Sequence, residues 1–147
     1  MQQQNNVVFV GDGGVGKTSI ANRLTGYGGF SETYAPTSGF KFLEGGIIDS
    51  SGQEKLGTDW STLRDIGRVA IVFDLTNRLS FKNLRFWIEL AQREFPLAQI
   101  SLVGNKSDCQ RKVNPQDIET LCNRHRIQCI EVSARTAANI DQILAPS

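Results

Sequence analysis

The chain has 147 residues, a formal net charge of +1 and 39% hydrophobic residues, as expected for one ordinary globular domain, 1–147, with a proper core. A charge near zero without a basic run argues against nucleic acid or an anionic membrane as the main partner. No apolar stretch is long enough to cross a membrane, and the polar start MQQQNN resembles neither a signal nor a transit peptide.

The cysteines have no metal-type spacing; they are Cys109, Cys122 and Cys129. Such residues are typical of reduced thiols in the cytosol, so we expect a cytoplasmic protein. None of them lies at the C-terminus, so we expect no lipid anchor in this chain.

Strands and helices are expected to alternate along the chain. Apolar runs bounded by turn signals predict strands at residues 7–10, 40–44, 47–48, 69–74, 100–104 and 129–132. Helical patterns fall at residues 19–24, weakly at 56–66, and then at 80–95, from 114 onward and at 137–144. Residues 30–38 are expected to form a loop. This order predicts an α/β fold of three layers, with helices on both faces of a mainly parallel sheet and a short antiparallel hairpin at its edge.

Capping residues mark the helix ends. Tyr27 and the two glycines after it should end the first helix, and Pro96 should stop the helix that begins near Ser80, its expected cap. Asn114 followed by Pro115 is a typical helix start. The apolar residues expected to face the sheet recur at helical spacing: Phe81, Leu84, Ile88, Ala91 and Phe95.

The run GDGGVGKT, from Gly11 to Thr18, lies between the first strand and the first helix. Glycines let several backbone N–H groups point at one anion, and the helix N-terminus adds its dipole. Lys17 can bind the β- and γ-phosphates of a nucleotide, and Thr18 offers a hard oxygen to Mg²⁺. A plain glycine-rich turn is the alternative, but Gly-Lys-Thr at this spacing favours a phosphate-binding loop.

A second polar loop, DSSGQ, follows the strand at residues 47–48. Asp49 can hold Mg²⁺, usually through a water, and the Gly52 N–H can bind a γ-phosphate. Gln53 can orient the attacking water in hydrolysis. An ordinary solvated loop is the alternative, and the phosphate-binding loop upstream argues against it.

The third and fourth motifs, NKSD and SAR, also follow strands. Asp108 can accept two hydrogen bonds from the N1 and N2 edge of guanine, whereas adenine would leave the carboxylate unpaired. Asn105 can tie its loop to the phosphate-binding loop, and the stem of Lys106 can cover the base. Ser133, Ala134 and Arg135 would complete the base pocket. Because ligands bind beyond the C-terminal ends of parallel strands, all four motifs should form one site.

With these motifs, the chain resembles a Ras-like small GTPase, most closely the Rab branch, over nearly its whole length. The resemblance implies a P-loop NTPase G domain that binds GTP and GDP with Mg²⁺. It also implies that Phe30 packs on the guanine, that Tyr34 closes over the phosphates and that Thr37 ligates Mg²⁺ when the γ-phosphate is present. A side chain at Gly13 would crowd Gln53.

The implied site residues fall into three groups. The catalytic residues are Gln53, Lys17 and Thr37. The Mg²⁺ ligands are Thr18, Thr37 and Asp49. The nucleotide-binding residues are Gly13, Gly14, Val15, Gly16, Lys17, Thr18, Ser19, Phe30, Tyr34, Thr37, Gly52, Asn105, Lys106, Asp108, Ser133, Ala134 and Arg135.

The resemblance further implies a switch that slowly hydrolyses GTP and acts in vesicle trafficking or signalling. Exchange factors, activating proteins and effectors would bind from Phe30 to Ser38 and from Gly52 to Ile66. The chain departs from the family between Thr37 and Asp49, where it is roughly ten residues shorter than a typical two-strand connection. Its final helix is also short, and Arg135 replaces the usual lysine.

Two other classes of function remain open on the sequence. One is a nucleotide-binding interaction module with little hydrolysis, which the shortened connection favours. The other is an ATP-using P-loop enzyme, against which the guanine-type NKSD argues.

Overall fold

The computed structural model describes residues 6–26, 40–51 and 58–145, together with the backbone of residues 32–35. In this part of the chain, strands form one seven-stranded sheet in the order β2-β3-β4-β1-β5-β6-β7. Strands β4, β1, β5, β6 and β7 are parallel, and β2, β3 and β4 pair antiparallel. The bounds are β1 Asn6–Val10, β2 Glu32–Ala35, β3 Phe40–Leu43, β4 Ile47–Asp49, β5 Ile66–Asp74, β6 Gln99–Asn105 and β7 Gln128–Glu131.

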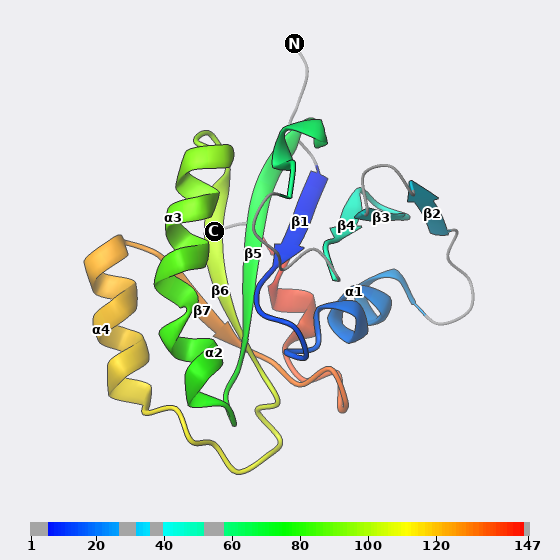
Figure 1. Cartoon of the computed structure of the whole chain (residues 1–147). Coiled ribbons are helices and arrows are strands. Elements are labelled where there is room, and N and C mark those ends of the chain that lie inside the picture. The colour runs from blue at the N-terminus through cyan, green and yellow to red at the C-terminus, as the bar shows by residue number, and fades with distance from the viewer. Residues whose placement is uncertain (1–5, 27–31, 36–39, 52–57, 146–147) are drawn as a thin grey trace.

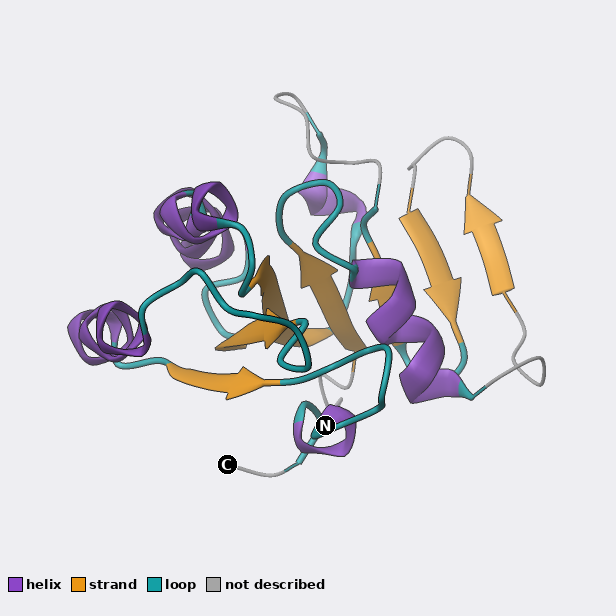
Figure 2. Cartoon of the chain, turned by 90° about the horizontal axis from the view of Figure 1, so that it is seen from below, coloured by secondary structure: helices purple, strands orange, loops and turns teal. Residues whose placement is uncertain are grey.

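Helices cover both faces of the sheet (Figures 1 and 2). Helices α2 (Arg78–Lys82), α3 (Leu84–Glu94) and α4 (Pro115–His125) lie on one face. Helix α1 (Lys17–Thr25) and the 3₁₀ turn η2 (Ile140–Gln142) lie on the other. The predicted three-layer α/β fold with a mainly parallel sheet is therefore confirmed.

Two hydrophobic cores fill the space between the layers, because the side chains of the central strands alternate between faces. Along β5, Ile71 and Phe73 belong to the core under α3, whereas Ala70 and Val72 belong to the core under α1. All four side chains are buried. This double burial explains the continuous apolar run that marked the central strand.

The antiparallel edge of the sheet differs partly from the prediction. The expected hairpin is present, since β3 and β4 pair across the turn at Glu44, Gly45 and Gly46. The loop expected at residues 30–38 is wrong in its middle, where Glu32–Ala35 forms β2 and pairs with β3. An edge strand of this kind is stabilised by backbone pairing with a neighbour, which a local sequence pattern does not reveal.

The weak helical prediction at residues 56–66 is wrong in its described part. Trp60–Thr62 forms a single 3₁₀ turn, η1, and Ile66 already begins β5. Trp60 is buried against the rings of Phe40, Trp87 and Phe95. Tertiary packing of one aromatic side chain, rather than helical periodicity, therefore determines the course of this segment.

Helix ends also correct several predictions. Asn77, not Ser80, caps α2, because its side chain accepts hydrogen bonds from the N–H groups of Leu79 and Ser80. The helix expected at 80–95 is divided at Asn83 into α2 and α3. Helix α1 ends at Thr25, where Gly26 has a positive φ of 83°, and the last helix is reduced to η2. The start of α4 is as predicted, with Asn114 as cap and Pro115 in the first turn.

Candidate functional site

The phosphate-binding loop connects β1 to α1, as predicted. Its glycines at 11, 14 and 16 have positive φ values of 141°, 81° and 101°. A Cβ on Gly11 would overlap the backbone carbonyl of Val72, and one on Gly16 would overlap the side-chain amide of Asn105. The loop therefore requires glycine at both positions for close packing as well as for backbone conformation.

Lys17 holds this loop together from inside. Lys17 is only 2% exposed. Its ammonium group donates to the carbonyl oxygens of Gly11 at 2.5 Å and of Asp12 at 2.8 Å. The cation is thereby fixed at the start of the loop, where a lysine that binds phosphates is needed.

Thr18 and Asp49 bring two hard oxygen atoms together at the C-terminal edge of the sheet. The Thr18 hydroxyl donates to the Asp49 carboxylate at 2.5 Å. Ser51 donates to the same carboxylate through its N–H at 2.9 Å and its hydroxyl at 2.7 Å. Within the described residues no three His, Cys, Asp or Glu side chains gather. A threonine and one carboxylate nevertheless suit Mg²⁺, which keeps several waters and takes its other ligands from phosphates.

Asn105 connects the phosphate-binding loop to the SAR segment. Its side-chain N–H donates to the Val15 carbonyl at 2.9 Å, and its side-chain oxygen accepts from the Ala134 N–H at 3.1 Å. Asn105 is buried. The predicted tie to the phosphate-binding loop is confirmed, and the same side chain also holds the base-side loop.

The Asp108 carboxylate lies at the same end of the sheet. It accepts hydrogen bonds from the Ser133 hydroxyl at 2.7 Å and from the Arg135 guanidinium at 3.0 Å. The hydrogen bonds from Ser133 and Arg135 lower the pKa of Asp108 from its ordinary value. The group therefore remains an ionised acceptor, as the predicted recognition of guanine would require.

Lys106 forms a contact that the sequence did not predict. Its ammonium group lies 2.7 Å from the Asp74 carboxylate at the end of β5, and its backbone has a positive φ of 68°. Burial raises the pKa of Asp74, but hydrogen bonds from Lys106 and Thr76 outweigh it, so the pKa lies below its ordinary value. The lysine stem is thus anchored at its end beside the expected base pocket.

A cavity of about 530 Å³ lies between these motifs. Its lining includes Gly16 and Ser19 from the phosphate-binding loop and α1, together with Lys106, Asp108 and Ala134. The phosphate-binding loop, NKSD and SAR therefore surround one hollow, as the strand-end argument predicted for them. The described residues of DSSGQ do not line it, and Asp49 instead meets the phosphate-binding loop through its hydrogen bond with Thr18.

Sequence reasoning missed Asn22 and Arg23, which also line this cavity. Arg23 donates to the carbonyl oxygens of Ala134 at 2.7 Å and Arg135 at 2.6 Å. Helical spacing contained the signal, because residues three and four positions after Ser19 lie on the same face of α1.

Several predicted site residues lie outside the described part of the structure. They are Phe30, Thr37, Gly52 and Gln53, and the side chain of Tyr34 belongs with them. Gly13 and Gly14 are described and lie exposed on the phosphate-binding loop. The roles expected for all of these residues remain predictions.

Comparisons with known proteins give a consistent result. A model of the Ras family matches residues 6–146. The chain is 32% identical to Ras-related protein Rab-13 of Rattus norvegicus, over 92% of this chain and 74% of that protein. It is 34% identical to Ras-related protein Rab-32D of Dictyostelium discoideum, over 95% and 70%. It is also 34% identical to Ras-related protein Rab-5B of Plasmodium falciparum (isolate 3D7), over 91% and 71%.

The alignment with the first of these proteins is 151 positions long, which exceeds the 147 residues of this chain. The alignment therefore contains gaps in this chain. The described strands of the short connection before Asp49 span four and three residues.

Proposed function

The chain belongs to the Ras family of small GTPases and is Rab-like, and from this membership we propose that residues 1–147 form one guanine-nucleotide switch whose site is the cavity between the phosphate-binding loop, NKSD and SAR. The observation that carries the proposal is the double hydrogen bond of Asn105, to Val15 and to Ala134. It joins a phosphate-binding loop and a base-binding loop into one site of fixed geometry.

Guanine would bind beside Asp108. The ionised carboxylate accepts from the N1–H and the N2 amino group of guanine, and adenine presents no such pair of donors. Adenine would leave a charged acceptor without partners, which is a costly mismatch. Ser133 and Arg135 hold the carboxylate in place, and the Lys106 stem would cover one face of the base.

The phosphates would bind to the N–H groups between Gly13 and Ser19, with Lys17 as the cation on the β- and γ-phosphates. Thr18 and Asp49 fit a Mg²⁺ site, the second of them through a water, and Thr37 would join them. When bound, the ion would neutralise developing charge on the phosphates.

Hydrolysis would convert GTP and water into GDP and inorganic phosphate. Gln53 would orient the water that attacks the γ-phosphorus, and the bond to the β–γ bridging oxygen breaks as GDP leaves. We expect slow turnover without an activating protein, on the order of 10⁻⁴ s⁻¹, which is the intrinsic rate of Ras taken as a guide for the family. The lack of a side chain at Gly13 would leave room for Gln53 and for an arginine from an activator.

The switch would act through the segments from Phe30 to Ser38 and from Gly52 to Ile66. The γ-phosphate would hold them through Thr37 and Gly52, and hydrolysis would release them. Exchange factors, activating proteins and effectors would bind there, in vesicle trafficking or signalling from the cytosol. No helix in the described residues combines the length and apolar character needed to span a membrane.

A single-turnover GTP assay tests hydrolysis. We expect slow release of phosphate from the natural chain, and a lower rate from the Gln53→Leu variant, because leucine cannot orient water. Equal rates in the two proteins would instead favour a nucleotide-binding interaction module. The short β3–β4 hairpin is the observation that keeps this second function open.

A further inference from the structure

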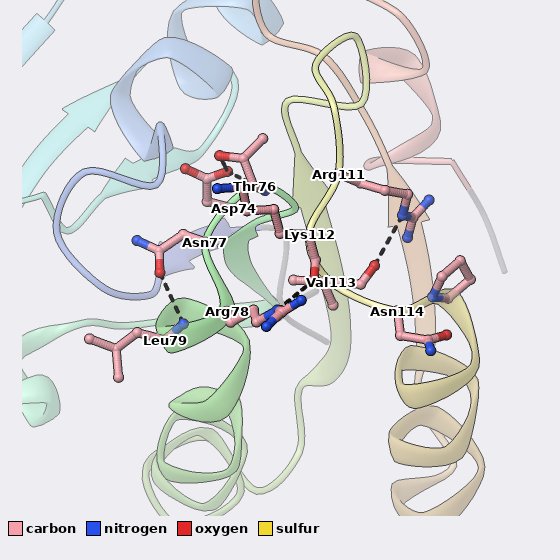
Figure 3. A pocket seen from close by; sticks show the side chains of 10 residues that line it. Asp74, Thr76, Asn77, Arg78, Leu79, Arg111, Lys112, Val113 and Asn114 are labelled. Carbon is pink, nitrogen blue, oxygen red and sulfur yellow. Dashed lines mark hydrogen bonds between the residues drawn. The ribbon is translucent and has the colours of Figure 1, made fainter.

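A second hollow lies outside the nucleotide site, between the start of α2 and the start of α4 (Figure 3). Its volume is about 960 Å³. A neighbouring hollow of about 430 Å³ shares Arg78, Lys112, Val113 and Asn114 with it. We call the two together the α2–α4 groove. Leu79 lies at its α2 side and Asn114 at its α4 side.

The charges exposed in the groove are mainly positive. Arg78, Lys82 and Lys112 line it, and in the described part of the chain none of the three forms an ion pair. Arg78 donates from Nε to the carbonyl oxygen of Lys112 at 3.0 Å. This bond fixes the guanidinium against the groove wall and leaves its terminal nitrogens for an outside acceptor.

Of the described residues that line the groove, the other charged ones are two that form ion pairs, Arg111 and Asp74, and one unpaired acid, Asp117. Arg111 binds Glu131 through two hydrogen bonds of 3.0 and 2.9 Å. Asp74 is paired with Lys106. Asp117 is the acidic side chain that remains unpaired among the described lining residues. The groove thus offers an excess of positive charge, although the chain as a whole is nearly neutral.

The groove also carries apolar surface. Leu79 is 63% exposed and lines the larger hollow. Val113 and Pro115 line the adjoining wall, and Phe81 lines the smaller hollow. The N-terminus of α4 opens at the same place and adds a partial positive charge.

We propose that the α2–α4 groove docks a short acidic segment of a partner protein, with one apolar side chain placed against Leu79. Charge complementarity supports this occupant, because the larger hollow places Arg78 and Lys112 beside the exposed Leu79, and Lys82 lines the smaller hollow. None of these three cations forms an ion pair in the described part of the chain. Nucleic acid fits less well, since the positive charge is confined to this groove and Asp117 lies within it. The proposal does not depend on nucleotide hydrolysis.

Amide chemical shifts test the proposal, measured in the natural chain with the nucleotide that remains bound to it through purification. The probe is a heptapeptide of alternating glutamate and leucine, and its matched control carries lysine in place of each glutamate. We expect the acidic peptide to shift amides within residues 75–82 and 111–117, and the lysine peptide to leave them unchanged.

Variants then locate the charges. Arg78→Glu combined with Lys112→Glu should weaken binding about tenfold or more, because two attractions become repulsions. Both side chains are exposed, so the fold should persist. Leu79→Ser should also weaken binding. Arg85→Glu is the control for charge reversal outside the groove, since the Arg85 side chain is 71% exposed on α3 and lines neither hollow.

Three results would overturn the proposal. One is the absence of shifts at these amides at millimolar peptide. Another is equal loss of binding in the Arg85→Glu control. The third is that inorganic phosphate or a single-stranded oligonucleotide saturates the same amides while the acidic peptide does not. The amount of bound nucleotide is measured in every variant. A variant that keeps its nucleotide but loses the peptide has an intact nucleotide site, so the loss then concerns the groove.

Discussion

Asp12 of the phosphate-binding loop accepts a hydrogen bond from the indole N–H of Trp87 on α3, at 2.8 Å. The side-chain amide of Asn83 donates to the other oxygen of the same carboxylate at 2.7 Å. Trp87 also packs edge-on against Trp60, whose ring contacts Phe40. The phosphate-binding loop is therefore connected to the aromatic cluster that surrounds η1.

Trp87→Phe should lower the free energy of unfolding by about 1–3 kcal/mol beyond the loss from packing, because it removes a hydrogen bond to a charged acceptor. Urea unfolding of the nucleotide-loaded protein measures the loss. Trp60→Phe is the control, because Trp60 is similarly buried and makes no such hydrogen bond within the described residues. Equal losses in both variants would show that packing alone matters.

Arg23→Lys should speed release of bound GDP by about tenfold, because a lysine cannot hold both carbonyl oxygens in the geometry of the guanidinium. The two carbonyls belong to Ala134 and Arg135, which line the cavity proposed to bind the base. Release of a fluorescent GDP analogue measures the rate. Arg124→Lys, an exposed change on α4, should leave it unchanged, and unaltered release from the Arg23 variant would contradict the proposed role.

Asp108→Asn should shift the base preference from guanine toward xanthine. The amide presents a donor where the carboxylate accepted, and xanthine presents an acceptor in place of the guanine amino group. Competition between GDP and xanthosine diphosphate measures the shift. Undiminished preference for GDP in the variant would remove Asp108 from the base pocket.

Lys106→Met should change how stability depends on pH. The pKa of Asp74 is lowered in the folded chain, so its ionised form stabilises the fold at neutral pH, and this stabilisation is lost as the pH falls through the folded pKa. The difference in unfolding free energy between the natural chain and the variant should therefore be constant above about pH 5 and shrink in more acidic solution. A difference that grows on acidification would contradict this role for the Asp74–Lys106 pair.

The sequence predicted the strand ends that carry the site, because each combines a buried apolar run with a polar or glycine-rich motif. Gly11, Asp49 and Asn105 all lie where that pattern placed them. It did not predict β2, whose pairing with β3 is a long-range property. It also misassigned residues 56–66, where the packing of Trp60 outweighs a weak helical pattern.

Within the site, the motifs predicted which residues meet but not what holds them. Arg23 belongs to no motif, and its partners lie more than a hundred residues further along the chain. The stem of Lys106 was expected to cover the base, and the pairing of its charged end with Asp74 was not predicted. Such contacts depend on which strands become neighbours, so a local pattern cannot identify them.

The identity of the nucleotide released when the purified chain is denatured tests the central claim most directly. The proposed site predicts GDP or GTP, in an amount close to one molecule per chain, because Asp108 is proposed to select guanine and Asn105 joins two sides of one cavity. Release of an adenine nucleotide, or equal retention of ATP and GTP after reloading, would contradict the proposed guanine-nucleotide switch.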